Sequence, residues 1–250
     1  MMMEVAANSV IGKQRTSNED YIGYFYNSQN AMIAILADGV GGSNGGDIAA
    51  SMAVDYIGNQ FENYKIKSIS ETKEWLSEII KNINSQIIEI GLHDETLSNM
   101  ATTIVVALFF GNQFMLTHLG DSRCYLLRNE KLQQLTIDHS YVNFLVEKGE
   151  LNPEEAASSE MKNVIVKGLG VSSNAEVDIS TIQIKPNDEL LICSDGLTKM
   201  IDNNEIQSIL QKRISTKQKL DTLIDNANDN GGLDNISAIV INNLLGSDHL

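Results

Sequence analysis

Short runs of apolar, β-branched and aromatic residues recur along the chain and predict β-strands. Gly111-Asn112 and Asn129-Glu130 form tight breaks beside these runs, and such breaks typically join antiparallel neighbours. The predicted strands comprise residues 21–26, 32–37, 102–110, 113–119, 124–128, 177–184, 189–194 and 236–242.

Longer segments with a helical period separate these strand clusters. They comprise residues 47–64, 71–90 and 216–227, and a polar helical stretch at 141–163 contains the start signal Asn152-Pro153. Strands neighbour strands and helices form their own blocks, so an α+β fold with helices covering antiparallel sheets is favoured over a βαβ series. We interpret residues 1–245 as one domain with a small flap subdomain at 141–163, followed by a short tail at 246–250.

Composition and charge narrow the class of protein. The 250 residues are 42% hydrophobic, enough for one sizeable core, and 33 acidic against 18 basic residues give a formal net charge of -15. This charge repels phosphate backbones, so nucleic acid is a poor partner. Cys124 and Cys193 lack the spacing of a zinc site, and no segment approaches the roughly 18 apolar residues of a membrane span. We therefore expect a cytoplasmic monomer without membrane insertion.

Four aspartates stand where predicted strands end or begin: Asp38, Asp121, Asp195 and Asp234. Taken singly, each is explained as a turn residue beside glycine or another small or polar residue. If they converge, each pair repels by roughly 4 kcal/mol at about 4 Å and an effective dielectric near 20, so cations must lie between them. Oxygen ligands indicate magnesium or manganese, and Gly39 would allow a backbone carbonyl to approach the metal.

A charged motif, Arg15-Thr16-Ser17-Asn18-Glu19-Asp20, precedes the first predicted strand. Alone, it is as readily interpreted as a solvated turn. Beside a metal cluster, the planar fork of Arg15 suits phosphate oxygens, while Glu19 and Asp20 suit water molecules bound to the metals.

In order along the chain, eight motifs resemble those of the metal-dependent protein phosphatases of the protein phosphatase 2C type, in particular their bacterial branch. They are RTSNED, ADGVGG, ATT, LGDSRCYL, TIDHS, KNVIVKGLG, CSDGL and LDNIS, and they span Arg15 to Ser237. The resemblance implies a central antiparallel β-sandwich of two sheets, flanked by α-helices on both faces in an α-β-β-α arrangement.

The resemblance also implies a binuclear Mn²⁺ or Mg²⁺ site and a third ion beside it. Asp38 would bridge two ions, with the Gly39 carbonyl, Asp195 and Asp234 completing the pair. Asp121 would bind the third ion together with Asp195. Asn235 would contact these ligands without binding a metal itself.

The implied activity is hydrolysis of phosphoserine and phosphothreonine in proteins. Two metals about 3.5–4 Å apart can acidify a bridging water to hydroxide and orient it for direct attack on phosphorus, while Arg15 binds the phosphate oxygens. The implied partners are phosphorylated proteins, among them a bacterial Ser/Thr kinase and its substrates. Val40 stands where animal members carry histidine, so the proton donor to the leaving group is unassigned.

Two alternatives remain at this stage. A metal-binding regulatory domain of the same fold with little activity is disfavoured, because Arg15, Asp38, Asp195 and Asp234 are all present. A calcium-binding loop at 226–237 is disfavoured because Ser237 replaces the bidentate glutamate. Two histidines near these motifs, His118 and His139, are interpreted as packing or hydrogen-bonding residues.

Overall fold

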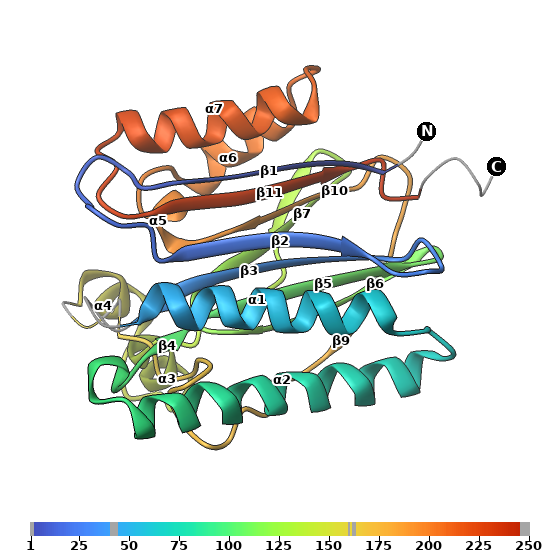
Figure 1. The fold of residues 1–250 in the computed structure, drawn as a ribbon. Coiled ribbons are helices and arrows are strands. Elements are labelled where there is room, and N and C mark those ends of the chain that lie inside the picture. Colours follow the sequence, from blue (N-terminus) through green and yellow to red (C-terminus); the bar gives the residue numbers. More distant parts are fainter. Residues whose placement is uncertain (1–2, 41–44, 160, 162–163, 246–250) are drawn as a thin grey trace.

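The computed structural model describes residues 3–40, 45–159, 161 and 164–245, and its centre is a sandwich of two antiparallel sheets (Figure 1). The first sheet has the order β1 (Glu4–Val10), β11 (Ile236–Asn242), β10 (Glu189–Cys193), β7 (Arg123–Arg128) and β8 (Lys131–Gln134). The second has the order β2 (Asp20–Tyr26), β3 (Met32–Val40), β5 (Ile104–Phe110), β6 (Gln113–Leu119) and β9 (Ser180–Gln183), and the short β4 (Ala101–Thr102) pairs with the end of β3.

The central strands are buried on both faces, which explains their continuous apolar runs. In β3, Ile33 and Ile35 face the helices, whereas Ala34 and Leu36 face the other sheet. A half-exposed strand would show alternating polar residues, but here both faces require apolar side chains.

Helices cover the outer face of each sheet (Figure 1). Residues of α1 (Gly46–Asn63) and α2 (Ile69–His93) share one apolar core with the second sheet. The first sheet is covered by α5 (Asp195–Thr198), α6 (Asn203–Leu210) and α7 (Thr216–Asp229). The α-β-β-α arrangement expected from the sequence is confirmed.

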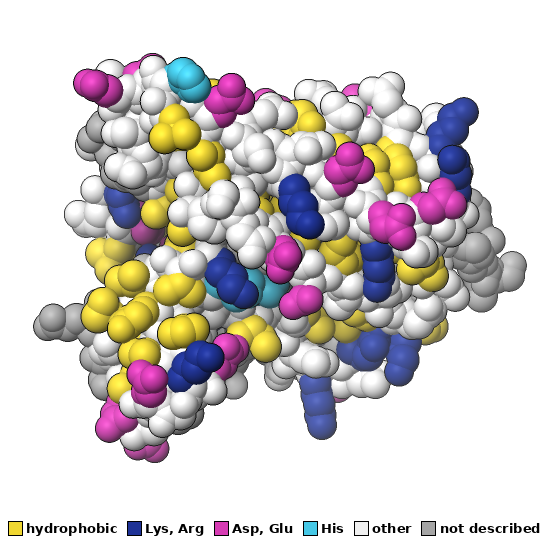
Figure 2. All heavy atoms as spheres, turned by 90° about the horizontal axis from the view of Figure 1, so that it is seen from below, with side chains coloured by type: hydrophobic (Ala, Val, Ile, Leu, Met, Phe, Trp, Pro, Cys, Tyr) yellow, Lys and Arg dark blue, Asp and Glu magenta, His cyan; other side chains and the backbone are white. Residues whose placement is uncertain are grey.

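Two features of the described surface bear on possible partners. On the face over α2, acidic and basic side chains are interspersed with apolar ones (Figure 2), unlike the basic surface of a nucleic-acid-binding protein. Within the described ranges, none of the helices combines the length and hydropathy that a membrane span requires.

Two short helices, α3 (Tyr141–Glu147) and α4 (Pro153–Ser158), occupy the predicted flap range. They lie at the end of the sandwich opposite the chain termini (Figure 1). Asn152 begins α4 with a reciprocal capping box, as its position before proline predicted. Residues 160, 162 and 163 of the predicted flap, and the predicted tail 246–250, lie outside the described residues.

Several element boundaries differ from those predicted. The strand predicted to end at residue 37 continues to Val40, because β2 pairs Asp20 with Asp38 and β4 pairs Thr102 with Gly39. The predicted strand 102–110 is interrupted at residue 103, and 177–184 shortens to β9. The edge strand β1 was missed because the polar residues of its sequence, EVAANSV, interrupt both a continuous apolar run and a regular alternation.

Candidate metal centre

The four aspartates come from different strands and gather at one end of the sandwich. Asp38 and Asp121 belong to the second sheet, at β3 and just after β6, whereas Asp195 and Asp234 belong to the first, just after β10 and just before β11. Burial raises the pKa of Asp38 well above its usual range, and the charges of Asp20, Asp195, Asp121 and Asp234 raise it further. The folded chain thus concentrates negative charge at this end.

Asp38 is held at the end of β3 by hydrogen bonds to a threonine pair. Its N–H donates to Thr103 Oγ1 at 3.0 Å, and its carbonyl accepts from the Thr103 N–H at 2.9 Å and Thr102 Oγ1 at 3.0 Å. Thr103 Oγ1 also shares a hydrogen bond of 2.7 Å with Ser122 Oγ. The ATT motif therefore connects Asp38 to the turn that carries Asp121.

Gly39 occupies a position where only glycine fits. A Cβ there would lie 2.3 Å from the Gly46 carbonyl oxygen and 2.6 Å from that of Glu19. Three backbone segments approach one another closely here, and they leave no room for a side chain at position 39.

Asp121 carries the clearest sign of a cation-binding role. Its Oδ1 is buried and has no hydrogen-bond partner. Burial raises the pKa of Asp121 to about 7, and the charges of Asp195 and Asp138 contribute. A buried carboxylate oxygen without a partner costs about 1–3 kcal/mol or more, which a metal ion would offset. Carboxylate oxygens such as this one are the donors that divalent metals such as magnesium and manganese prefer.

Two side-chain cations lie among these carboxylates. Lys199 Nζ lies 2.5 Å from Asp195 Oδ2 and 3.4 Å from Asp234 Oδ2, and Arg15 Nη2 lies 2.9 Å from Asp234 Oδ1. Burial alone would lower the pKa of Lys199, but Asp195, Asp234 and Asp38 raise it above its ordinary value. Among the described residues, no three acidic side chains, histidines or cysteines have the arrangement that would hold a metal ion.

The predicted supporting residues connect the strand ends to the Arg15 segment. Asp20 lies opposite Asp38 and accepts a hydrogen bond of 2.8 Å from Ser194 Oγ. Asn235 Oδ1 accepts from the Glu19 N–H at 2.9 Å, and Asn235 Nδ2 donates to the carbonyls of Ile11 and Ser17 at 2.9 and 2.8 Å.

Asn235 therefore holds the loop that carries Arg15 and Glu19 against the start of β11. Burial raises the pKa of Glu19 while the charge of Arg15 lowers it, and the nearby carboxylates of Asp47 and Asp234 add to the rise.

A cavity of about 610 Å³ lies between the metal-site residues and the α3–α4 segment. Asp121, Asp195 and Lys199 line one part of it, and Val142 and Val146 of α3 line another. A substrate group bound in this cavity would lie beside the carboxylates.

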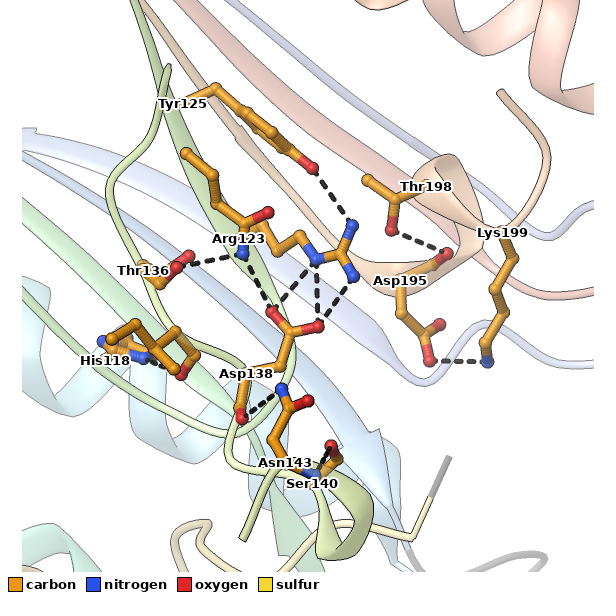
Figure 3. A network of polar contacts seen from close by, with 12 residues as sticks. His118, Arg123, Tyr125, Thr136, Asp138, Ser140, Asn143, Asp195, Thr198 and Lys199 are labelled. Carbon is orange, nitrogen blue, oxygen red and sulfur yellow. Dashed lines mark hydrogen bonds and ion pairs between the residues drawn. The ribbon is translucent and has the colours of Figure 1, made fainter. Parts of the chain in front are cut away.

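A partly buried ion pair connects β7 with the start of α3 (Figure 3). Arg123 binds Asp138 through Nε and Nη2, the shortest contact being 2.7 Å, and Arg123 Nη1 donates to the Tyr125 hydroxyl at 3.1 Å. The Asp138 carbonyl accepts from Asn143 Nδ2 at 3.0 Å, which fixes the first turn of α3. Neither this pair nor Lys199 was predicted from the sequence, although Lys199 follows Asp195 by four residues, one helical turn.

The two histidines near the site bond to the backbone. His118 Nε2 lies 2.7 Å from the Ile137 carbonyl oxygen, and His139 Nδ1 accepts from the Gly120 N–H at 3.2 Å. Their rings stack with centroids 4.5 Å apart. The structure therefore agrees with their interpretation as packing and hydrogen-bonding residues. The rejected calcium loop is a helix end, with Asn230 capping α7.

The sequence and the fold of this chain are similar to those of known proteins. Residues 12–238 match the sequence profile described as protein phosphatase 2C. Protein phosphatase PhpP of Streptococcus pneumoniae is 38% identical over 239 residues, which cover 96% of this chain and 97% of PhpP.

Two solved structures are also similar. The Streptococcus agalactiae serine/threonine phosphatase has a TM-score of 0.92 and 36% identity, with 96% of this chain and 98% of that chain covered. The catalytic domain of the serine threonine protein phosphatase PstP, solved in complex with 2 manganese ions, has a TM-score of 0.82 and 30% identity, with 96% and 97% covered.

Proposed function

Because this chain belongs to the protein phosphatase 2C family and is a serine/threonine protein phosphatase of the bacterial type, we propose that it hydrolyses phosphoserine and phosphothreonine using metal ions held by its converging aspartates. The observation that carries the metal site is the buried Oδ1 of Asp121, which has no partner and lies among other carboxylates. The PstP domain, a relative of the same fold, is described with two manganese ions, which supports manganese or magnesium as the cofactor.

The division of the aspartates between the ions follows the family resemblance. Asp38, the Gly39 carbonyl, Asp195 and Asp234 would hold two ions, and Asp121 would hold a third together with Asp195. When bound, the ions supply a hydroxide nucleophile at neutral pH and neutralise charge on the phosphoryl group. The chain itself fixes Asp38 through Thr103.

Arg15 is the proposed ligand of the phosphate oxygens. Its side chain is 49% exposed and pairs with Asp234, so the guanidinium lies at the edge of the site facing solvent. The fork of donors can turn from Asp234 to a phosphate dianion, which offers a stronger charge-assisted pair. Asn235 accepts from the Glu19 N–H and so holds the loop that carries Arg15 against the start of β11.

Phosphorylated proteins are the proposed substrates, with a Ser/Thr kinase and its targets as the partners that supply them. The cavity of about 610 Å³ beside Asp121 and Asp195 can receive the residues around the phosphoryl group. The alternative of an inactive regulatory domain is not favoured, because the aspartates and Arg15 stand together at one end of the fold.

The proposal is tested by phosphate release from a phosphothreonine peptide with the full chain. Activity should require Mn²⁺ or Mg²⁺, and chelation should abolish it. Asp38→Ala should lower kcat/KM at least about a thousandfold, because it removes several kcal/mol of charge stabilisation.

Asp229→Ala is the matched control. Asp229 lies at the end of α7 and forms an exposed ion pair with Lys13. Loss of this pair should leave activity unchanged. Full activity in chelator, or in a folded Asp38→Ala variant, would overturn the proposed mechanism.

A further inference from the structure

The Lys199 ammonium lies among the carboxylates of the candidate metal centre. The backbone N–H of Lys199 bonds to the Asp195 carbonyl at 2.8 Å, so the two side chains extend from one helical turn. The ammonium lies 2.5 Å from Asp195 Oδ2 (Figure 3). It lies 3.4 Å from Asp234 Oδ2, and the side chain is only 30% exposed.

The carboxylates that Lys199 contacts are those proposed to bind the two central ions. In Asp234, Oδ2 faces Lys199 and Oδ1 faces Arg15, so each oxygen has its own side-chain cation. Asp121 differs, because its Oδ1 is buried without a partner. The two side-chain cations, Lys199 and Arg15, therefore pair with Asp195 and Asp234.

From this arrangement, which rests on the proposed metal site, we propose that Lys199 is a built-in competitor of the metal ions at Asp195 and Asp234. In the metal-free protein, its ammonium relieves the repulsion between these carboxylates. A divalent ion binding the same oxygens must displace the ammonium or bind against its repulsion, and either case weakens the metal's affinity. Lys199 also lines the cavity of about 610 Å³, which gives the displaced side chain space to withdraw.

Lys199→Met tests the proposal, because methionine keeps most of the length of the side chain and removes its charge. Calorimetric titration of chelator-treated protein with Mn²⁺ should show binding at least tenfold tighter than in the wild type. Lys199→Arg, which keeps the charge, should stay within about threefold of the wild type. Thermal melting without metal should show a lower Tm for Lys199→Met, and saturating Mn²⁺ should raise that Tm by more than it raises the wild type's.

Lys217→Met is the matched control. Lys217 forms an ion pair of 2.7 Å with Asp221 four residues away, but on the exposed side of α7. Its loss should leave the Mn²⁺ affinity unchanged.

The outcomes separate this proposal from the metal site on which it rests. Equal or weaker Mn²⁺ binding by Lys199→Met, with normal binding by the wild type, would overturn the role of Lys199 alone. A wild type that binds no Mn²⁺ would overturn the metal site and this proposal with it. If the Lys199→Met protein does not fold, Lys199→Gln carries the same expectation and the same criterion.

Discussion

Asp20 lies directly opposite Asp38 in the antiparallel register of β2 and β3, so two carboxylates share one face of the sheet. Burial raises the pKa of Asp20 to about 6, and Ser194 and Ser237 only partly offset this through hydrogen bonds. Like charges at directly opposite positions destabilise a sheet. The fold tolerates this pair at the point where cations are proposed to bind.

The pair predicts how the metal-free protein responds to pH. The pKa of Asp20 is higher in the folded chain than its ordinary 3.8, so the folded state binds more protons between pH 3.8 and about 6. The contribution of Asp20 to the free energy of unfolding therefore falls as the pH rises through that window, and it is lowest above about pH 6. Asp20→Asn in chelator should be more stable than the wild type by up to about 3 kcal/mol at neutral pH, with the difference vanishing near pH 3.8.

Denaturant unfolding at several pH values measures this difference directly. The comparison of the two proteins isolates Asp20 from His139, whose pKa is lowered to about 4 by burial and the neighbouring His118. A stability difference that stays constant with pH would contradict the prediction. Saturating Mn²⁺ should shrink the difference, because bound cations favour ionised carboxylates.

Arg15→Ala should raise KM for a phosphothreonine peptide about 10- to 100-fold with a small change in kcat. The substitution removes charge-assisted hydrogen bonds to phosphate, worth about 1.5–3 kcal/mol, and leaves the nucleophile in place. Arg15→Lys should recover only part of the loss, because an ammonium cannot form the bidentate fork. Steady-state kinetics in saturating Mn²⁺ gives both constants.

Lys13→Ala serves as the control for Arg15, since Lys13 lies two residues away and pairs with Asp229 outside the site. Its KM should equal that of the wild type. An unchanged KM for Arg15→Ala would remove Arg15 from the substrate site.

Arg123→Met should destabilise the protein by about 1–3 kcal/mol, because it leaves the partly buried Asp138 carboxylate without its charged partner. That side chain is 14% exposed, and Arg123 supplies three of its hydrogen bonds. The double variant Arg123→Met/Asp138→Asn should recover part of the loss, because no unpaired charge remains. Urea unfolding of the four proteins of the cycle measures the coupling. Equal destabilisation by the single and double variants would contradict the assigned pairing.

Local chemistry made much of the fold predictable. The last strand was predicted with its observed bounds, and the break at Asn129-Glu130 joins β7 to β8 with both residues at positive φ. Asp121, Asp195 and Asp234 stand beside strand ends as predicted, because each belongs to a short turn motif that the sequence displays.

Features that depend on distant segments could not be predicted in the same way. The continuation of β3 through Asp38 requires β2 and β4 as pairing partners, and hydrophobic periodicity in residues 32–37 carries no trace of them. The ion pairs of Arg15 with Asp234 and of Arg123 with Asp138 likewise join residues far apart in the chain. Only the folded arrangement shows which charges meet.

The division of the aspartates between the two sheets links metal binding to folding. An ion held by Asp38 from one sheet and by Asp195 and Asp234 from the other would bind only while the sheets stay packed. By mass action, each such ion at a hundred times its Kd adds about 2.7 kcal/mol to the stability of the whole molecule. The supply of manganese or magnesium would then set how long the folded enzyme survives as well as how fast it works.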